Sequence, residues 1–119
     1  MKIRSAKAKG ARLCKELRDA LLAAFPGSLV PGDIAVTAAS VPGPDLYLSP
    51  RARDLLGFQF ECKNTEKLNL NSAIEQARSH CRGDEIPCLV FRRNRSGAHA
   101  VLPLDSFIRL LAAAKREFK

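Results

Sequence analysis

The sequence predicts an α/β domain in which helices flank a small mixed β-sheet. Segments with apolar residues at helical spacing are interleaved with shorter segments that alternate apolar and polar residues, and the expected order is α-β-β-β-α-β-β-α. The chain has 119 residues, which is the length of one domain. Its hydrophobic fraction of 46% and charged fraction of 27% are those of an ordinary globular protein. We therefore expect residues 1–119 to form a single domain.

The first helix is expected over residues 7–25, and Pro26 and Gly27 end it. Residues 1–6 are expected to precede it as a flexible basic tail. The apolar positions of this helix recur at helical spacing and comprise Leu13, Cys14, Leu17, Leu21 and Ala24.

Three strands are expected next. Residues 33–39 have β-branched character, and a turn follows at 41–44 because its two prolines supply no hydrogen-bond donor to a sheet. Residues 45–48 form a short second strand, and 49–57 form a connection with one helical turn. Residues 57–63 then alternate. Phe58, Phe60 and Cys62 share one face of this strand, and Gln59, Glu61 and Lys63 share the other.

The second half of the chain repeats the alternation. A helix is expected over 71–82, an apolar strand over 87–92, and a hairpin partner over 99–102 after the basic turn at 93–97. A closing helix begins at Leu104 or Asp105, with Asp105 or Ser106 near its N-cap, and ends at residue 116.

The charge balance favours a polyanionic partner. Lys and Arg number 20 and Asp and Glu 12, so the net charge is +8, and nucleic acid is the first candidate. No apolar run approaches the ~20 residues of a membrane span, and the basic start lacks the apolar stretch of a secretory signal. We expect a cytoplasmic protein, in a bacterium or in the host cell of a virus.

The four cysteines form no C-x-x-C pair, and the two histidines complete no zinc spacing. We expect Cys14, Cys62, Cys81 and Cys88 to be reduced and mostly buried thiols.

The chemistry is concentrated in the two middle strands. If Leu48 pairs with Phe58 in an antiparallel hairpin, Asp45 lies opposite or diagonal to Glu61. Lys63 shares the strand face of Glu61. Two adjacent carboxylates repel each other unless a cation lies between them, and their oxygens suit Mg²⁺ or Mn²⁺. The alternative without a functional role for Glu61 and Lys63 is an ion pair on a solvated strand face.

These residues resemble the PD-(D/E)xK nuclease motif. Pro44-Asp45 is followed after fifteen residues by Glu61-Cys62-Lys63, and the expected order of elements resembles the restriction-endonuclease-like αβββαβ core. The nearest relatives by this resemblance are the archaeal Holliday-junction resolvases and the small VRR-type nucleases of phages and repair enzymes. The resemblance implies a Mg²⁺- or Mn²⁺-dependent endodeoxyribonuclease, possessing a metal site formed by Asp45, Glu61 and the carbonyl of Cys62, with Lys63 assisting the attacking water.

Two further residues are assigned by the same resemblance. By the resemblance, Glu16 would reach the metal through water. It borders the apolar stripe of the first helix, so it can face the sheet. The alternative for Glu16 is an ion pair with Arg12. Gln76 resembles a glutamine that follows ExK in several branches, although those branches often have an aromatic where this chain has His80. For Asp33 we favour a structural role in a turn or at the start of a strand.

The expected partner is duplex or branched DNA, because the chain has no Trp and one Tyr for stacking on single-stranded bases. We expect a homodimer, because two-fold DNA structures suit two-fold proteins. A role in DNA recombination or repair follows from the resemblance. The alternatives are a nucleic-acid-binding protein without catalysis and an RNA-directed nuclease with the same chemistry; the basic residues could also serve solubility alone. The expected DNA contacts are Arg4, Lys7, Lys9, Arg12, Arg51, Arg53, Arg92, Arg93 and Arg95.

Overall fold

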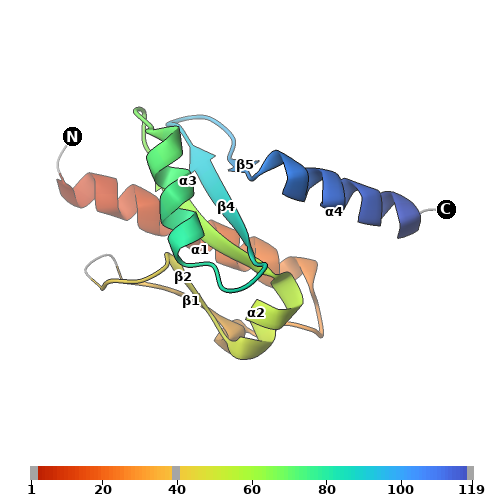
Figure 1. The fold of residues 1–119 in the computed structure, drawn as a ribbon. Helices are drawn as coiled ribbons and strands as arrows, with labels where there is room; N and C mark the ends of the chain where they lie inside the picture. The colour runs from red at the N-terminus through yellow and green to blue at the C-terminus, as the bar shows by residue number, and fades with distance from the viewer. Residues whose placement is uncertain (1–2, 39–40, 118–119) are drawn as a thin grey trace.

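The computed structural model describes residues 3–38 and 41–117, with side chains at 8–38 and 41–116. Two small sheets and four α-helices make up this part of the chain (Figure 1). The predicted class, an α/β protein with a small mixed sheet flanked by helices, is confirmed.

The larger sheet is mixed and has the order β3-β4-β5. β3 (Phe58–Asn64) runs parallel to β4 (Ile86–Arg92), and β5 (His99–Val101) pairs antiparallel with β4. Between β3 and β4 the chain forms α3 (Leu70–Ser79), which packs on both strands. Its buried residues are two alanines, whose small side chains let the helix approach the sheet closely.

The other face of the sheet is covered by α1 (Ile3–Ala24), which lies across β3 on the side away from α3 (Figure 1). The apolar stripe predicted for this helix forms the center of the core, where Leu13 and Cys14 are buried. The core cluster joins α1 to the small sheet and to β3 and β4 through Ile34, Leu46, Leu48, Phe60, Cys62, Cys88 and Val90.

The smaller sheet pairs β1 (Ile34–Val36) antiparallel with β2 (Leu46–Leu48). A 3-10 turn, η1 (Pro31–Asp33), leads into β1, and Asp33 joins the start of β1 to the residue that follows β2. Its carboxylate accepts hydrogen bonds of 2.8 Å from the Val30 N–H and from the Ser49 hydroxyl. The structural role favoured for Asp33 is therefore what the structure shows.

The connection between β2 and β3 is a seven-residue helix, α2 (Pro50–Leu56), rather than the single turn expected. The Ser49 hydroxyl caps its start by accepting from the Ala52 N–H at 3.1 Å. Gly57 ends it in the left-handed conformation, at φ 66°, which only glycine adopts without strain. Because this connection is a full helix, β2 and β3 are not the two arms of a hairpin.

The predicted antiparallel pairing of Leu48 with Phe58 is accordingly wrong. Leu48 pairs with Ile34, and Phe58 pairs with Ile86. Within the described residues β2 and β3 are neighbours without a ladder between them. The Cys62 N–H donates instead to a side chain, the carboxylate of Asp45, at 2.7 Å.

The helix boundaries also differ from those predicted. α1 begins at Ile3, so residues 3–6, expected in a flexible tail, are helical, while residues 1–2 lie outside the described part. α3 begins at Leu70 because the Asn69 side chain caps it, accepting from the Ser72 N–H at 3.0 Å. The first strand is shorter than the expected 33–39, and residue 39 is outside the described part. The last helix, α4 (Leu104–Glu117), starts at the first of its two predicted positions.

Candidate active site

Asp45, Glu61 and Lys63 are brought together at the junction of the two sheets. Asp45 immediately precedes β2, and its Oδ2 accepts the hydrogen bond from the Cys62 N–H. Glu61 and Lys63 lie two residues apart in β3, and the Lys63 Nζ is 3.3 Å from the Glu61 Oε2. This hydrogen bond between the Asp45 side chain and the main chain of β3 therefore places the Asp45 carboxylate beside Glu61. The sequence had predicted that a ladder between β2 and β3 would do so.

Glu61 is in an unfavourable place for a negative charge. Its side chain is 8% exposed. Burial raises the pKa of Glu61, and the adjacent carboxylate of Asp45 raises it further, while Lys63 opposes both effects. The alternative of an ion pair on a solvated strand face does not describe Glu61. A buried pair of carboxylates is relieved either by a proton or by a cation.

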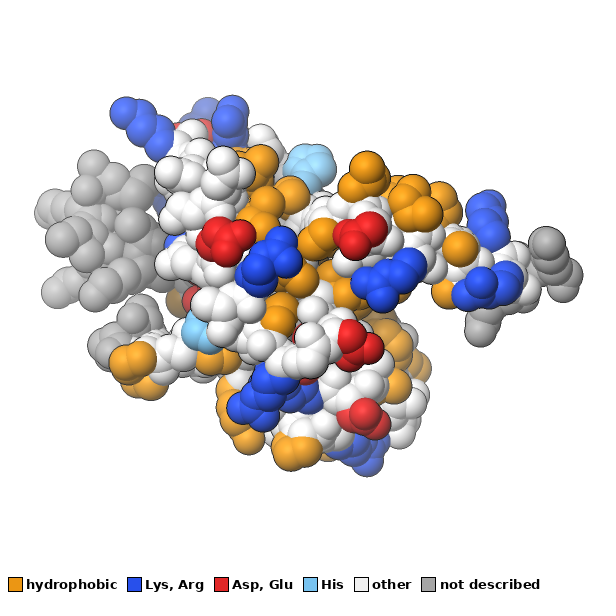
Figure 2. Space-filling view, in the orientation of Figure 1, with side chains coloured by type: hydrophobic (Ala, Val, Ile, Leu, Met, Phe, Trp, Pro, Cys, Tyr) orange, Lys and Arg blue, Asp and Glu red, His pale blue; other side chains and the backbone are white. Residues whose placement is uncertain are grey.

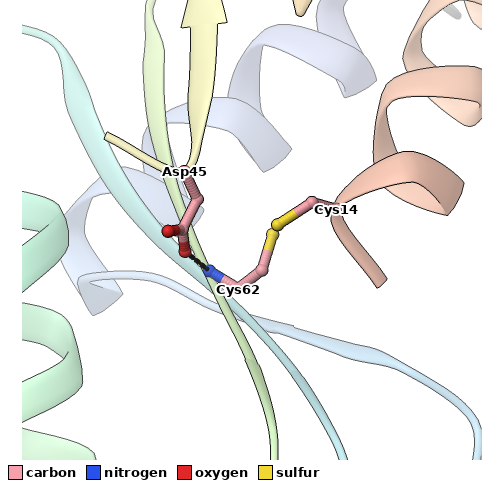
Figure 3. A group of neighbouring side chains, drawn as sticks. All are labelled: Cys14, Asp45 and Cys62. Carbon is pink, nitrogen blue, oxygen red and sulfur yellow. Dashed lines mark hydrogen bonds between the residues drawn. The ribbon is translucent and has the colours of Figure 1, made fainter. Parts of the chain in front are cut away.

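A second set of donors lies on the opposite side of β3. Cys14 of α1 and Cys62 point toward each other, with Asp45 beside them (Figure 3). The two sulfurs and a carboxylate oxygen of Asp45 all lie within 4.8 Å of one another, so this group could hold a metal ion. Both thiols are buried and free, as predicted, and the nearby Cys14 together with burial raises the pKa of Cys62 far above its usual range. Asp45 thus belongs to both donor sets.

Glu16 is not where the resemblance implied. Its side chain is 59% exposed and forms an ion pair of 2.6 Å with Arg92. Cys14, two residues earlier on α1, is the residue that faces the site, and positions two apart on a helix point in different directions. The expectation that Glu16 faces the sheet is therefore wrong, and its ion-pair partner is Arg92 rather than Arg12. Its contact with a metal through water stays a prediction.

Gln76 lies on α3 and is exposed. The hydrogen bond found for it involves its main-chain carbonyl, which accepts from the Ser79 hydroxyl at 2.7 Å. His80 caps the end of α3 with its backbone. Neither side chain is brought to the carboxylates by a contact within the described residues.

Gln59 was not predicted as a site residue. It is 1% exposed, and within the described residues both polar atoms of its amide lack a hydrogen-bond partner. It shares a strand face with Glu61 and Lys63 because residues two apart in a strand point the same way. The alternation of the strand was the signal that could have identified it.

Five of the predicted DNA contacts gather in one place, which we call the basic hollow. It has a volume of about 310 Å³ and lies at the end of β3 and β4, where Asn64 pairs with Arg92. The Lys9 Nζ donates to the Asn94 side chain at 2.8 Å, which joins α1 to the turn after β4. The guanidinium of Arg93 lies 5.9 Å from the centre of the Phe91 ring. The hollow is lined by Lys9, Arg12, Asn64, Arg92, Arg93, Asn94, Arg95 and Ser96.

Arg51 and Arg53 lie away from the basic hollow, on α2. Arg53 makes two hydrogen bonds to the Glu85 carboxylate, at 2.7 and 2.8 Å, and its side chain is mostly buried. Arg51 donates to the carbonyl of Ser28. The Arg53 guanidinium holds α2 against the segment before β4, and its contact with DNA stays a prediction. The side chains of Arg4 and Lys7 are outside the described part.

None of the helices in the described part of the chain is long and apolar enough to cross a membrane. In comparisons with models of protein families, with curated proteins and with solved structures, nothing matches this chain.

Proposed function

We propose that this protein is a metal-dependent endonuclease that hydrolyses phosphodiester bonds in DNA, and that it belongs to the PD-(D/E)xK nucleases. The observation that carries the proposal is the convergence of Asp45, Glu61 and Lys63, on a chain whose basic hollow lies at the end of the strand that carries Glu61 and Lys63. Carboxylates, an ammonium group and a phosphate-binding surface are the parts that such a hydrolysis needs.

The carboxylates fit a divalent cation. Burial and the adjacent carboxylate of Asp45 both raise the pKa of Glu61, so a cation between the two carboxylates would relieve both effects. Their hard oxygen atoms suit Mg²⁺ or Mn²⁺, and the Cys62 carbonyl would complete the set. A bound cation of this kind would neutralise charge on the phosphodiester and lower the pKa of a water bound to it.

The ammonium group of Lys63 is positioned to contact that water. Its side chain is one-third exposed, so the Nζ can face both Glu61 and an entering phosphate. An ammonium in an ion pair with Glu61 is held beside that carboxylate, from where it would orient the attacking water or donate to a phosphate oxygen.

The substrate is held by the basic hollow. Its arginines and lysine come from α1, from the end of β4 and from the turn that follows, so they form one surface. Contacts of Arg and Lys with phosphate fix the position of a duplex without reading its sequence. We therefore propose duplex or branched DNA as the substrate, and low sequence specificity.

The test is a cleavage assay on four DNA forms, namely a four-way junction, a linear duplex, a single strand and a supercoiled plasmid, each with Mg²⁺, Mn²⁺ or EDTA. We expect metal-dependent cleavage that Glu61→Gln abolishes, because the variant keeps the size of the side chain and loses its charge. Glu75→Gln is the matched control, since Glu75 is 70% exposed on α3. Cleavage that survives in Glu61→Gln would overturn the assignment of the site.

One observation favours a second candidate, a nucleic-acid-binding protein without catalysis. Arg92 in the basic hollow is already paired with Glu16, and Lys63 is paired with Glu61, so both cations have an acidic partner within the chain. Retarded migration of the same DNAs on a gel with no cleavage under any metal would favour this candidate. Cleavage of RNA in preference to DNA would indicate an RNA-directed nuclease with the same site.

A further inference from the structure

α4 leaves an apolar surface uncovered. The helix projects from the rest of the molecule (Figure 1), and every residue from Phe107 to Arg116 is exposed. Figure 2 shows hydrophobic side chains along the upper side of this helix. The large apolar side chains and their exposed fractions are Leu104 74%, Phe107 47%, Ile108 51%, Leu110 40% and Leu111 43%.

Four of these residues form one stripe. Leu104, Phe107, Ile108 and Leu111 follow the i, i+3, i+4, i+7 spacing that places side chains on one face of a helix. A stripe of this kind is stable in water only against another apolar surface. The helix therefore has the pattern of an interface but has no partner within the described chain.

The distribution of size along the helix indicates what that partner is. The bulky residues of the stripe lie in the first half of α4, whereas in the second half Ala112 and Ala114 flank the continuation of the stripe at Lys115. If two copies of α4 pair antiparallel, the bulky half of each helix meets the alanines of the other. A parallel pair would place bulk against bulk and leave the alanine halves poorly packed.

The distribution of charge selects the same arrangement. Asp105 lies in the first turn, and Lys115 and Arg116 lie in the last turn. Antiparallel pairing brings Asp105 of each copy beside the basic end of the other, whereas parallel pairing brings like charges together. Antiparallel helices also align their dipoles favourably.

We infer that a second copy of this chain covers this surface, through an antiparallel α4–α4 contact about a two-fold axis. Such a contact is isologous, so both copies use the same residues. The 14 residues of α4 give a contact about 21 Å long. Because the contact is a single pair of short helices, we expect a reversible dimer rather than a permanent one. The inference does not depend on the proposed nuclease activity.

The test is sedimentation velocity of the whole protein over a wide range of concentration. We expect the wild type to dimerise, and Phe107→Glu to raise the dissociation constant roughly tenfold or more. Leu55→Glu is the matched control, because Leu55 is equally exposed, at 45%, on α2. Thermal unfolding of each variant shows that the fold itself is kept.

A charge exchange tests the antiparallel geometry. Asp105→Lys should weaken the dimer, and adding Lys115→Glu in the same chain should restore it, because the pair is then reversed between the two copies. A wild type that stays monomeric at all concentrations, or a dimer that none of these α4 variants alters, would overturn the inference.

Discussion

The carboxylate of Asp45 accepts the main-chain N–H of Cys62 at 2.7 Å, and this single bond connects the two sheets at the candidate site. It places one carboxylate beside another, Glu61, whose pKa is raised by burial and by Asp45. It also places Asp45 next to two buried thiols (Figure 3). The site therefore offers an oxygen donor set and a sulfur-containing one, and Asp45 is common to both.

Asp45→Asn should abolish stabilisation of the protein by Mg²⁺ or Mn²⁺. The amide oxygen of Asn can still accept from Cys62, so the variant should fold, but it removes one of the two negative charges that attract the cation. We expect the wild-type melting temperature to rise with metal and that of Asp45→Asn to stay constant. Asp19→Asn, on the exposed side of α1, is the control that should behave like the wild type. An equal shift in all three proteins would mean that the metal binds elsewhere.

Cys14→Ser distinguishes the two donor sets. If Mg²⁺ or Mn²⁺ is held by carboxylate and carbonyl oxygens, this variant keeps the metal-dependent shift of the melting temperature, because thiolates are poor ligands for hard cations. Binding of Co²⁺, followed by its thiolate absorption band, measures the sulfur set separately and should be lost in Cys14→Ser. Loss of the Mn²⁺ response in Cys14→Ser would move the proposed metal to the sulfur side of β3.

The basic hollow should control affinity for DNA. Arg93→Ala and Arg95→Ala should each weaken binding to a duplex by a similar factor whatever its sequence, and each should reduce the slope of log affinity against log salt concentration by about 1. The measurement is fluorescence anisotropy at several salt concentrations. Arg78→Ala, an exposed arginine on α3, is the control. A sequence-dependent loss would contradict contacts with phosphate alone.

The stabilisation that the charged form of Asp33 provides should be lost in acid. Hydrogen bonds from the Val30 N–H and the Ser49 hydroxyl lower the pKa of Asp33, so at acid pH the unfolded state binds more protons than the folded one. Its contribution is therefore complete above the ordinary aspartate range and is lost as the pH falls below about 4. Glu85 has a lowered pKa and acts in the same direction, whereas Glu61, with a raised pKa, acts in the opposite one.

Urea unfolding at a series of pH values checks this prediction. Asp33→Asn should be less stable than the wild type at neutral pH, and the difference should shrink as the pH falls. Ser49→Ala should lower the free energy of unfolding by about 1 kcal/mol, because it removes the cap of α2 as well as one donor to Asp33. A constant difference between Asp33→Asn and the wild type from neutral pH to pH 2 would contradict the assigned role of the Asp33 charge.

The local pattern of the sequence predicted the elements better than their pairing. The alternation of residues 57–63 correctly placed Glu61 and Lys63 on one face of a strand, since the period of a strand is fixed by backbone geometry. The pairing of β2 with β3 failed because it depends on the connection, and the Ser49 cap and Gly57 turn that segment into a helix. Asp45 reaches Glu61 all the same, through a side chain rather than a ladder.

Helical periodicity likewise did not predict the direction in which the Glu16 side chain points. The apolar stripe of α1 was predicted correctly, but a residue at its border can turn toward the sheet or toward solvent, and the position of Arg92 decides between them. Arg53 shows the same limit, because its partner Glu85 is 32 residues away in the sequence. Long-range ion pairs are set by the tertiary fold and have no local signal.

Single-turnover cleavage of an end-labelled DNA by wild type and Lys63→Met, with binding measured on the same samples, tests the central claim most directly. Lys63→Met keeps most of the side chain and removes the ammonium beside Glu61, while the basic hollow remains intact. We predict that both proteins bind the DNA with similar affinity, and that only the wild type cleaves it when Mg²⁺ is present. Equal cleavage by both proteins, or binding by the wild type without cleavage in any metal, would contradict the account.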